Sequence, residues 1–253
     1  ELPVVEVVDM RGVAQPDGLS LVLRDAMDET LAAGHQVILF YNRRGFARAW
    51  QCRDCGEILE CPNCDIALTY HLRPRRLLCH YCDHSIKVPE ICPGCEGGNF
   101  LPSGGGTEKV ELNLQALFPD ARILRLDHDS TRRRGSHQDI LATFARQEAD
   151  ILIGTQMVAK GHHFPGVTLV GVLAADHGLG LPDYRASERS FQLLTQVAGR
   201  SGRTMHGRVI FQSYQPEHPV IMAASEHDYA AFLRSELPVR KALSYPPYRR
   251  LVR

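Results

Sequence analysis

Short apolar runs alternate with amphipathic segments along most of the chain. Runs such as 36–41 and 151–154 are almost wholly apolar, as expected of strands buried on both faces of a parallel sheet. Segments such as 20–33 place apolar residues every three or four positions, which is typical of a helix that covers one face of a sheet. The expected strands are 3–8, 36–41, 123–126, 151–154, 167–174 and 208–212, and the expected helices are 20–33, 107–118, 136–146 and 187–198. This alternation predicts an α/β domain with a parallel, doubly wound sheet.

A cysteine-rich segment between residues 50 and 101 interrupts this pattern. It holds all eight cysteines, arranged as four Cys-x-x-Cys pairs at 52/55, 61/64, 79/82 and 92/95. Two residues between thiolates allow one turn of backbone to present both sulfurs to a tetrahedral zinc ion. A disulfide framework is the alternative, but the rest of the chain has no cysteine and is large enough to fold without disulfides. The spacing therefore predicts two zinc ions, each held by four thiolates.

A predicted β-hairpin indicates which Cys-x-x-Cys pairs, or knuckles, share a zinc ion. The apolar stretches 66–71 and 76–78 flank a turn that contains Pro74. A closed hairpin brings the second and third knuckles together, although sequential and crossed pairings are also possible. The nested pairing gives an inner site of Cys61, Cys64, Cys79 and Cys82 and an outer site of Cys52, Cys55, Cys92 and Cys95. We expect the outer site to close the neck of the insertion and the hairpin to project away from the sheet domain.

The domain boundaries follow from these two patterns. Residues 1–49 and 102–236 are expected to form one sheet domain, with 50–101 as a zinc-binding insertion. From 237 onward Pro238 and Pro246-Pro247 change the pattern, so 237–253 is expected to begin a further domain. The chain begins without Met and ends in a strand-like run, so we expect it to be a piece of a longer protein.

Charge and hydropathy limit where the protein can act and what it can bind. Lys and Arg total 29, Asp and Glu total 29, and no apolar run is long enough to span a bilayer. Any nucleic-acid binding must therefore come from local basic patches such as Arg43-Arg44. Reduced cysteines and the lack of a leader-like segment favour a cytoplasmic protein with no membrane partner.

Two segments carry candidate chemistry. Residues 154–164 follow a buried strand directly, and residues 196–203 end a helix with Gly199-Arg200-Ser201-Gly202-Arg203. Arginine neutralises the charge that develops on a transferring phosphoryl group, so two guanidiniums beside a sheet edge suit phosphoryl transfer. Taken alone, the second segment is more typical of a helix end whose arginines pair with acidic residues.

Together these segments resemble motifs V and VI of superfamily 2 helicases, and residues 37–46 lie where motif IV would be. With the eight-cysteine insertion, the chain resembles the PriA family of primosomal replication-restart helicases over almost its whole length. The resemblance implies the second RecA-like lobe of an ATP-dependent 3′-to-5′ DNA helicase that acts in replication restart and primosome assembly at forked DNA. Its implied partners are forked or single-stranded DNA, single-strand-binding protein and other primosome proteins, in the nucleoid-associated cytoplasm of a bacterium.

The resemblance also assigns roles to individual residues. At the ATP site, Arg203 and Arg200 would be arginine fingers, Gln196 would position the nucleotide or water, and Gly161 would line the nucleotide. On the DNA side, Thr107 and Thr155 would contact the DNA backbone. Arg43, Arg44 and Phe46 would lie on the same DNA path. ATP and Mg²⁺ would bind only with a first lobe, because Walker A and Walker B are absent from this sequence. We therefore expect no ATP hydrolysis by this chain alone. The alternative function is a zinc-containing scaffold that binds DNA or partner proteins.

Overall fold

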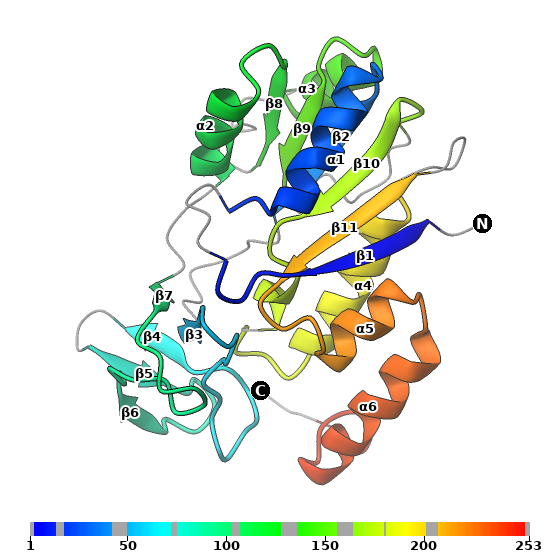
Figure 1. The fold of residues 1–253 in the computed structure, drawn as a ribbon. Helices are drawn as coiled ribbons and strands as arrows, with labels where there is room; N and C mark the ends of the chain where they lie inside the picture. Colours follow the sequence, from blue (N-terminus) through cyan, green and yellow to red (C-terminus); the bar gives the residue numbers. More distant parts are fainter. Residues whose placement is uncertain are drawn as a thin grey trace.

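The fold is centred on a six-stranded parallel sheet (Figure 1). The computed structural model describes residues 3–13, 18–41, 50–71, 75–102, 107–127, 136–155, 164–179, 181–200 and 207–250. The strands are β1 (Val4–Asp9), β2 (Gln36–Phe40), β8 (Ile123–Leu126), β9 (Ile151–Gly154), β10 (Val167–Val172) and β11 (Arg208–Ser213). They lie in the order β1-β11-β10-β2-β9-β8, and every neighbouring pair is parallel. The predicted parallel α/β sheet is confirmed.

Helices cover both faces of this sheet. The helices are α1 (Leu21–Ala32), α2 (Thr107–Leu117), α3 (Ser136–Ala145), α4 (Ala186–Ala198), α5 (Pro219–Ser225) and α6 (Tyr229–Ala242), and a short 3₁₀ helix, η1 (Ala175–Gly178), follows β10. One core joins α1 and α2 to Val37 and Leu39 of β2, and the other joins α3, α4 and α5 to Ile38 and Phe40. Because β2 is buried at all five positions, the four residues after Gln36 are apolar without alternation.

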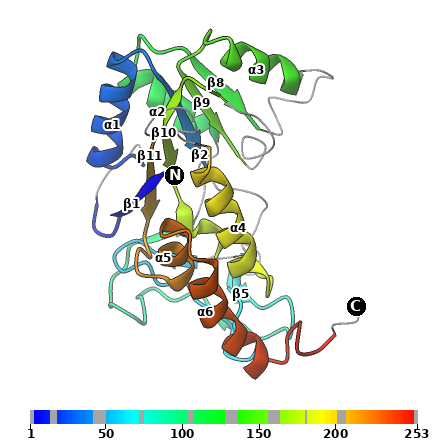
Figure 2. The ribbon, with the colours of Figure 1, turned by 90° about the vertical axis from the view of Figure 1, so that its right-hand side faces the viewer.

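The helix ends show how local sequence sets the boundaries. The Ser20 hydroxyl accepts a hydrogen bond from the Leu23 amide at 3.1 Å, which caps α1 as its sequence predicts. The Asp228 carboxylate caps α6 in the same way through the Ala231 amide at 2.8 Å. Helix α6 continues through Pro238, so the change of pattern at 237 does not coincide with a break in secondary structure. Helix α6 packs against α4 and α5 on one side of the sheet (Figure 2).

The insertion has its own small sheet and core. Strands β3 (Trp50–Cys52) and β7 (Phe100–Pro102) pair antiparallel at its neck. Strands β4 (Thr69–His71), β5 (Arg76–Leu78) and β6 (Ser85–Lys87) form a three-stranded antiparallel sheet, which confirms the predicted hairpin. Trp50, Leu68 and Leu77 pack with two of the cysteines in a separate hydrophobic cluster. Among the described helices, none is both long and apolar enough to cross a membrane.

Candidate metal centres and the carboxyl edge of the sheet

All four Cys-x-x-Cys pairs adopt the same turn. The amide of the residue after the second cysteine donates to the carbonyl of the first at 2.9–3.1 Å, and that residue is Gly56, Asp65, Asp83 or Glu96. Each of these four residues has a positive φ, between 52° and 83°. The amide of the first cysteine then bonds the carbonyl two residues beyond the second, at 2.8–2.9 Å. The repeated hydrogen bonds fix a turn that holds both thiols of a pair close together.

The four turns bring the thiols together in two groups of four. Within each group all sulfurs lie within 4.8 Å of one another, and the groups are Cys52, Cys55, Cys92 and Cys95, which we call the outer tetrad, and Cys61, Cys64, Cys79 and Cys82, the inner tetrad. These are the nested sets that the hairpin predicts. All eight thiols are free, so no disulfide joins them.

The sulfur spacing fits zinc. The Sγ atoms of Cys52 and Cys95 are 3.7 Å apart, those of Cys55 and Cys92 are also 3.7 Å apart, and those of Cys61 and Cys82 are 3.5 Å apart. Four sulfurs around a tetrahedral zinc ion, with Zn–S bonds of about 2.3 Å, are about 3.8 Å from one another. An all-thiolate donor set at this spacing suits a closed structural zinc site rather than a catalytic one, which would keep an open position.

Burial raises the pKa of four of the eight thiols, those of Cys52, Cys55, Cys61 and Cys64. The pKa of Cys55 rises to about 12. A hydrogen bond from the backbone of His84 lowers the pKa of the exposed Cys82 to about 7. Because zinc binds thiolates, metal binding must release protons from the buried thiols. Binding at these tetrads therefore weakens as pH falls.

The outer tetrad is seated on loops that follow β10 and β11. Gly56 lies so close to the loop after β11 that a Cβ atom there would come within 1.8 Å of the Tyr214 carbonyl oxygen. The Gly56 carbonyl also accepts a hydrogen bond from Gln215 Nε2 at 2.7 Å. Gln51 donates to the carboxylate of Asp176, which is 1% exposed and also accepts from the Tyr214 amide at 3.3 Å. These contacts, which we call the outer seat, hold the base of the insertion, formed by β3 and β7, against the carboxyl edge of the sheet.

The inner tetrad also contacts the sheet domain, through tyrosine side chains. The Tyr245 hydroxyl donates to the Cys64 carbonyl at 3.0 Å, and the Tyr184 amide donates to the Tyr81 hydroxyl at 3.4 Å. The rings of Tyr184 and Tyr245 stack at a centroid distance of 5.0 Å. The expectation that the hairpin projects away does not extend to the turns at its base that carry Cys64 and Tyr81, because these turns contact the sheet domain. Sequence spacing could not show this, because the contacts join residues far apart in the chain.

One acidic side chain beside the inner tetrad is strongly perturbed. Burial raises the pKa of Glu60 to about 7, and the neighbouring carboxylates of Asp65 and Glu57 add to the effect. The residue is nevertheless exposed to solvent. Ile58 and Ala67, on either side of it in the chain, pack into the same core as β2 and α4. The insertion therefore shares a hydrophobic contact with the sheet domain in addition to its polar contacts.

The two threonines assigned to DNA contact lie at the carboxyl ends of neighbouring strands. Thr155 follows β9 directly, is partly exposed, and its amide donates to the Leu126 carbonyl at 3.3 Å. Thr107 begins α2, but it is buried and its hydroxyl donates to the Asp127 carboxylate. A hydroxyl held by a carboxylate is poorly placed to meet a phosphate, which the same carboxylate would repel. Thr155 therefore fits the assigned role better than Thr107 does.

Two of the residues assigned to ATP, Gln196 and Arg200, lie at the end of α4. Gln196 is exposed in the last turn of that helix, and Arg200 is partly buried in the turn that follows it. The Arg200 amide donates to the Val197 carbonyl at 3.0 Å, so the helix end fixes the backbone from which its side chain extends. Arg203, Gly161, Arg43, Arg44 and Phe46 lie outside the described residues, and their roles stay predictions.

Two stretches of the chain match known protein families. Residues 61–87 match the PriA DNA helicase Cys-rich region (CRR) domain, and residues 106–205 match the helicase conserved C-terminal domain. The chain is 47% identical over 251 residues to replication restart protein PriA of Bacillus subtilis, which covers 98% of this chain and 31% of that protein. It is 48% identical over 259 residues to replication restart protein PriA of Synechocystis sp., covering 99% of this chain and 31% of that protein.

This chain resembles a segment of PriA. It spans about a third of the length of the curated PriA relatives that it matches. The match to the PriA Cys-rich region contains the inner tetrad, and the helicase match contains Thr107, Thr155, Gln196 and Arg200. The parallel sheet and the helicase match together confirm the predicted RecA-like lobe with a cysteine-rich insertion.

The similarity to solved structures is weaker. The helicase domain of Pyrococcus furiosus Hef aligns with a TM-score of 0.36 and 19% identity, over 79% of this chain and 26% of that one. A score at this level supports no further argument. The PriA resemblance therefore rests on the sequence matches and on the arrangement of sheet and insertion.

The seat of the outer tetrad was not foreseen from the sequence, although one signal was available. Of the four residues that follow a second cysteine, three are acidic and only Gly56 is a glycine. All four have a positive φ, so backbone conformation alone does not explain the difference. The close approach of Tyr214 does explain it, because only glycine fits there.

Proposed function

We propose that this chain is the second motor lobe of a DNA helicase that acts in replication restart. The observation that carries the proposal is 47% identity to PriA of Bacillus subtilis over 98% of the chain. The helicase match over 106–205 supports it, because that match spans the strand ends and the helix end where Thr155, Gln196 and Arg200 lie. On this proposal the protein translocates 3′ to 5′ and acts at forked DNA.

The proposed chemistry is shared between two lobes. A first lobe would hold ATP and Mg²⁺, and Arg203 and Arg200 of this chain would stabilise the charge that develops on the γ-phosphoryl group. Gln196 would position the nucleotide or the attacking water. Because the phosphate-binding loop would belong to the other lobe, this chain alone would bind nucleotide poorly and would not hydrolyse ATP. Turnover that is stimulated by DNA in the purified chain would contradict this part of the proposal.

The test is arginine substitution in the full-length protein. Arg203→Ala should lower kcat for ATP by roughly a thousandfold or more while leaving ATP binding largely intact, because an arginine finger acts mainly on the transition state. Arg185→Ala is the matched control, since Arg185 is an exposed arginine paired with Asp183 at 3.2 Å. Unchanged turnover in Arg203→Ala, or equal loss in Arg185→Ala, would remove Arg203 from the role.

The cysteine insertion supports a second function, that of a binding scaffold. We propose that the eight cysteines hold two zinc ions and that the insertion presents a rigid surface to DNA or to partners such as single-strand-binding protein and other primosome proteins. Its separate hydrophobic core and its seat on the sheet domain favour this function. DNA binding by the isolated chain that survives Arg200→Ala and Arg203→Ala together would support the scaffold, whereas loss of binding would assign the contact to the motor residues.

A further inference from the structure

The two ends of α4 face different parts of the molecule. Gln196 and Arg200, which are proposed to act on ATP, lie at its C-terminal end, and Tyr184 contacts the insertion just before its N-terminal end. The helix has 13 residues, so its ends are about 20 Å apart. Its buried face, which includes Leu194 and Val197, packs into the core of the sheet domain. The ATP end of α4 is therefore held mainly by packing along the helix rather than by the contact at its start.

Tyrosine side chains join the start of α4 to the inner tetrad. The Tyr184 amide donates to the Tyr81 hydroxyl at 3.4 Å, and the Tyr184 ring stacks on the ring of Tyr245. The Tyr245 hydroxyl donates to the Cys64 carbonyl at 3.0 Å. We call these contacts the tyrosine joint. Because Cys64 precedes the β4–β5 hairpin and Tyr81 follows it, the joint holds the base of the hairpin from both sides.

The sheet domain fixes the position of the Tyr184 ring. The guanidinium carbons of Arg185 and Arg240 lie 5.3 and 5.7 Å from the centroid of this ring. Arg240 in turn donates to Glu188 of α4 and to Glu236 of α6, each at 2.8 Å. The Arg240 side chain is 11% exposed, so these charge-assisted hydrogen bonds are largely shielded from solvent. Helices α4 and α6 therefore set where the ring meets the insertion.

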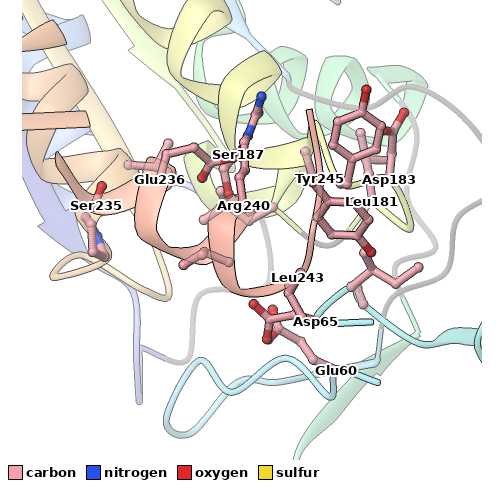
Figure 3. Close-up of a pocket in the computed structure, with 18 of the residues that line it drawn as sticks. Glu60, Asp65, Leu181, Asp183, Ser187, Ser235, Glu236, Arg240, Leu243 and Tyr245 are labelled. Atoms are coloured by element: carbon pink, nitrogen blue, oxygen red, sulfur yellow. Dashed lines mark hydrogen bonds and ion pairs between the residues drawn. The ribbon is translucent and has the colours of Figure 1, made fainter. Parts of the chain in front are cut away.

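A cavity of about 210 Å³ lies beside the joint, where the insertion, the loop before α4, and α6 meet. Figure 3 shows its lining, with Glu60 and Asp65 of the insertion on one side and Arg240 of α6 on the other. Tyr184 and Tyr245 belong to the same lining. Atoms that line a void lack packing partners across it. This side of the insertion is therefore held by the joint rather than by continuous packing against α6.

We propose that Tyr184 and Tyr245 are positioning residues for duplex opening, because the tyrosine joint sets the orientation of the insertion on the sheet domain. The outer seat alone would leave the insertion free to tilt about its base. The joint, beside the packing of Ala67 into the core, removes that freedom. The inference rests on the proposed helicase function, in which a DNA strand moves past the carboxyl edge of the sheet. A surface that acts on the duplex there must keep one orientation relative to that strand.

The position of the joint predicts an effect on duplex opening but not on ATP hydrolysis. The joint meets α4 at its N-terminal end, whereas Arg200 follows the other end of the helix. Loss of the joint should therefore leave ATP turnover as it is while the insertion no longer keeps its orientation. The number of base pairs opened per ATP hydrolysed is the quantity that should fall. A general loss of stability would lower turnover and duplex opening together and would leave this ratio unchanged.

Tyr184 allows a matched pair of variants. Tyr184→Phe keeps the ring and the backbone amide, which make the contacts of this residue in the joint. Tyr184→Ala keeps the amide but removes the ring that stacks on Tyr245. Tyr248→Ala is the control for the same chemical change, because Tyr248 is an exposed tyrosine outside the joint. Zinc content measured in each variant checks that both tetrads are intact.

The experiment measures ATP turnover and duplex opening by the full-length protein with zinc bound. We expect Tyr184→Ala to keep its DNA-stimulated turnover and its zinc but to open about tenfold fewer base pairs per ATP. Tyr184→Phe and Tyr248→Ala should match the unaltered protein. An unchanged number of base pairs per ATP in Tyr184→Ala, an equal loss in either of the other variants, or loss of zinc from Tyr184→Ala would each overturn the proposal. An unaltered protein that opens no duplex would instead contradict the proposed helicase function.

Discussion

The two cysteine tetrads are built from the same turn but are attached to the sheet domain in different ways. The outer tetrad is held by close backbone approach at Gly56 and by a buried carboxylate, Asp176. The inner tetrad is held by hydrogen bonds and ring stacking among Tyr81, Tyr184 and Tyr245, beside the packing of Ala67 into the core of the sheet domain. A backbone contact in a buried seat cannot shift without disrupting the loop beneath it, whereas stacked side chains can repack. The comparison indicates that the outer tetrad anchors the insertion and that the inner tetrad rests on the domain through a more adaptable contact.

The largest effect is expected from Gly56→Ala. Its Cβ atom would meet the Tyr214 carbonyl oxygen at 1.8 Å, so the neck must move away from the loop after β11. We expect the free energy of unfolding to fall by about 2–4 kcal/mol, measured by chemical denaturation with zinc present. Asp83→Ala is the control, because it places alanine at the same turn position with φ +59°. Equal losses in the two variants would show that the seat adds nothing to the turn.

A smaller effect is expected at the inner contact. Tyr245→Phe removes the hydroxyl that donates to the Cys64 carbonyl at 3.0 Å but keeps the ring stacked on Tyr184. We expect a loss of about 1 kcal/mol in the free energy of unfolding. Tyr248→Phe, at an exposed tyrosine nearby in the chain, provides the control. A loss as large as that of Gly56→Ala would remove the distinction between the two attachments.

The smallest effect concerns the pH response of the outer seat. Burial raises the pKa of Asp176 above its ordinary value of 3.8, so the folded chain binds this proton more tightly than the unfolded chain. Its contribution to stability is therefore fully present below 3.8 and is lost as pH rises through the folded pKa. Asp176→Asn has no carboxyl group to titrate here, so it lacks this pH-dependent contribution to stability. The difference in unfolding free energy, wild type minus variant, should grow as pH falls toward 3.8, and a constant difference would contradict the assignment.

Local geometry explains which features could be predicted from the sequence. The continuous apolar run of β2 and the hairpin around Pro74 depend on residues close together in the chain, and both were predicted correctly. The hairpin in turn gave the grouping of the cysteines found in the structure. Contacts between distant segments were not predictable in this way. The bond from Tyr245 to Cys64 spans 181 positions, and that from Tyr184 to Tyr81 spans 103, so no spacing rule relates them.

The C-terminal helices were missed for a different reason. Helix α5 has only 7 residues, which is too short for a clear amphipathic period, although Pro219 in its first turn is a helix-start signal. Helix α6 contains Pro238, and proline inside a helical pattern normally argues for a helix end. The packing of Phe232 against Phe191, with ring centroids 4.6 Å apart, holds α6 on the domain and outweighs that local preference.

The most direct test of two nested zinc centres is the metal content of purified chains that each lack four of the eight cysteines. Alanine at Cys52, Cys55, Cys92 and Cys95 removes the whole outer tetrad, whereas alanine at Cys52, Cys55, Cys61 and Cys64 removes two ligands from each tetrad. The unaltered chain should hold two zinc ions with a tetrathiolate spectrum, the first variant should hold one ion bound by four sulfurs, and the second should hold no ion bound by four sulfurs. One ion in the unaltered chain, or an ion bound by four sulfurs in the second variant but not in the first, would contradict the nested arrangement.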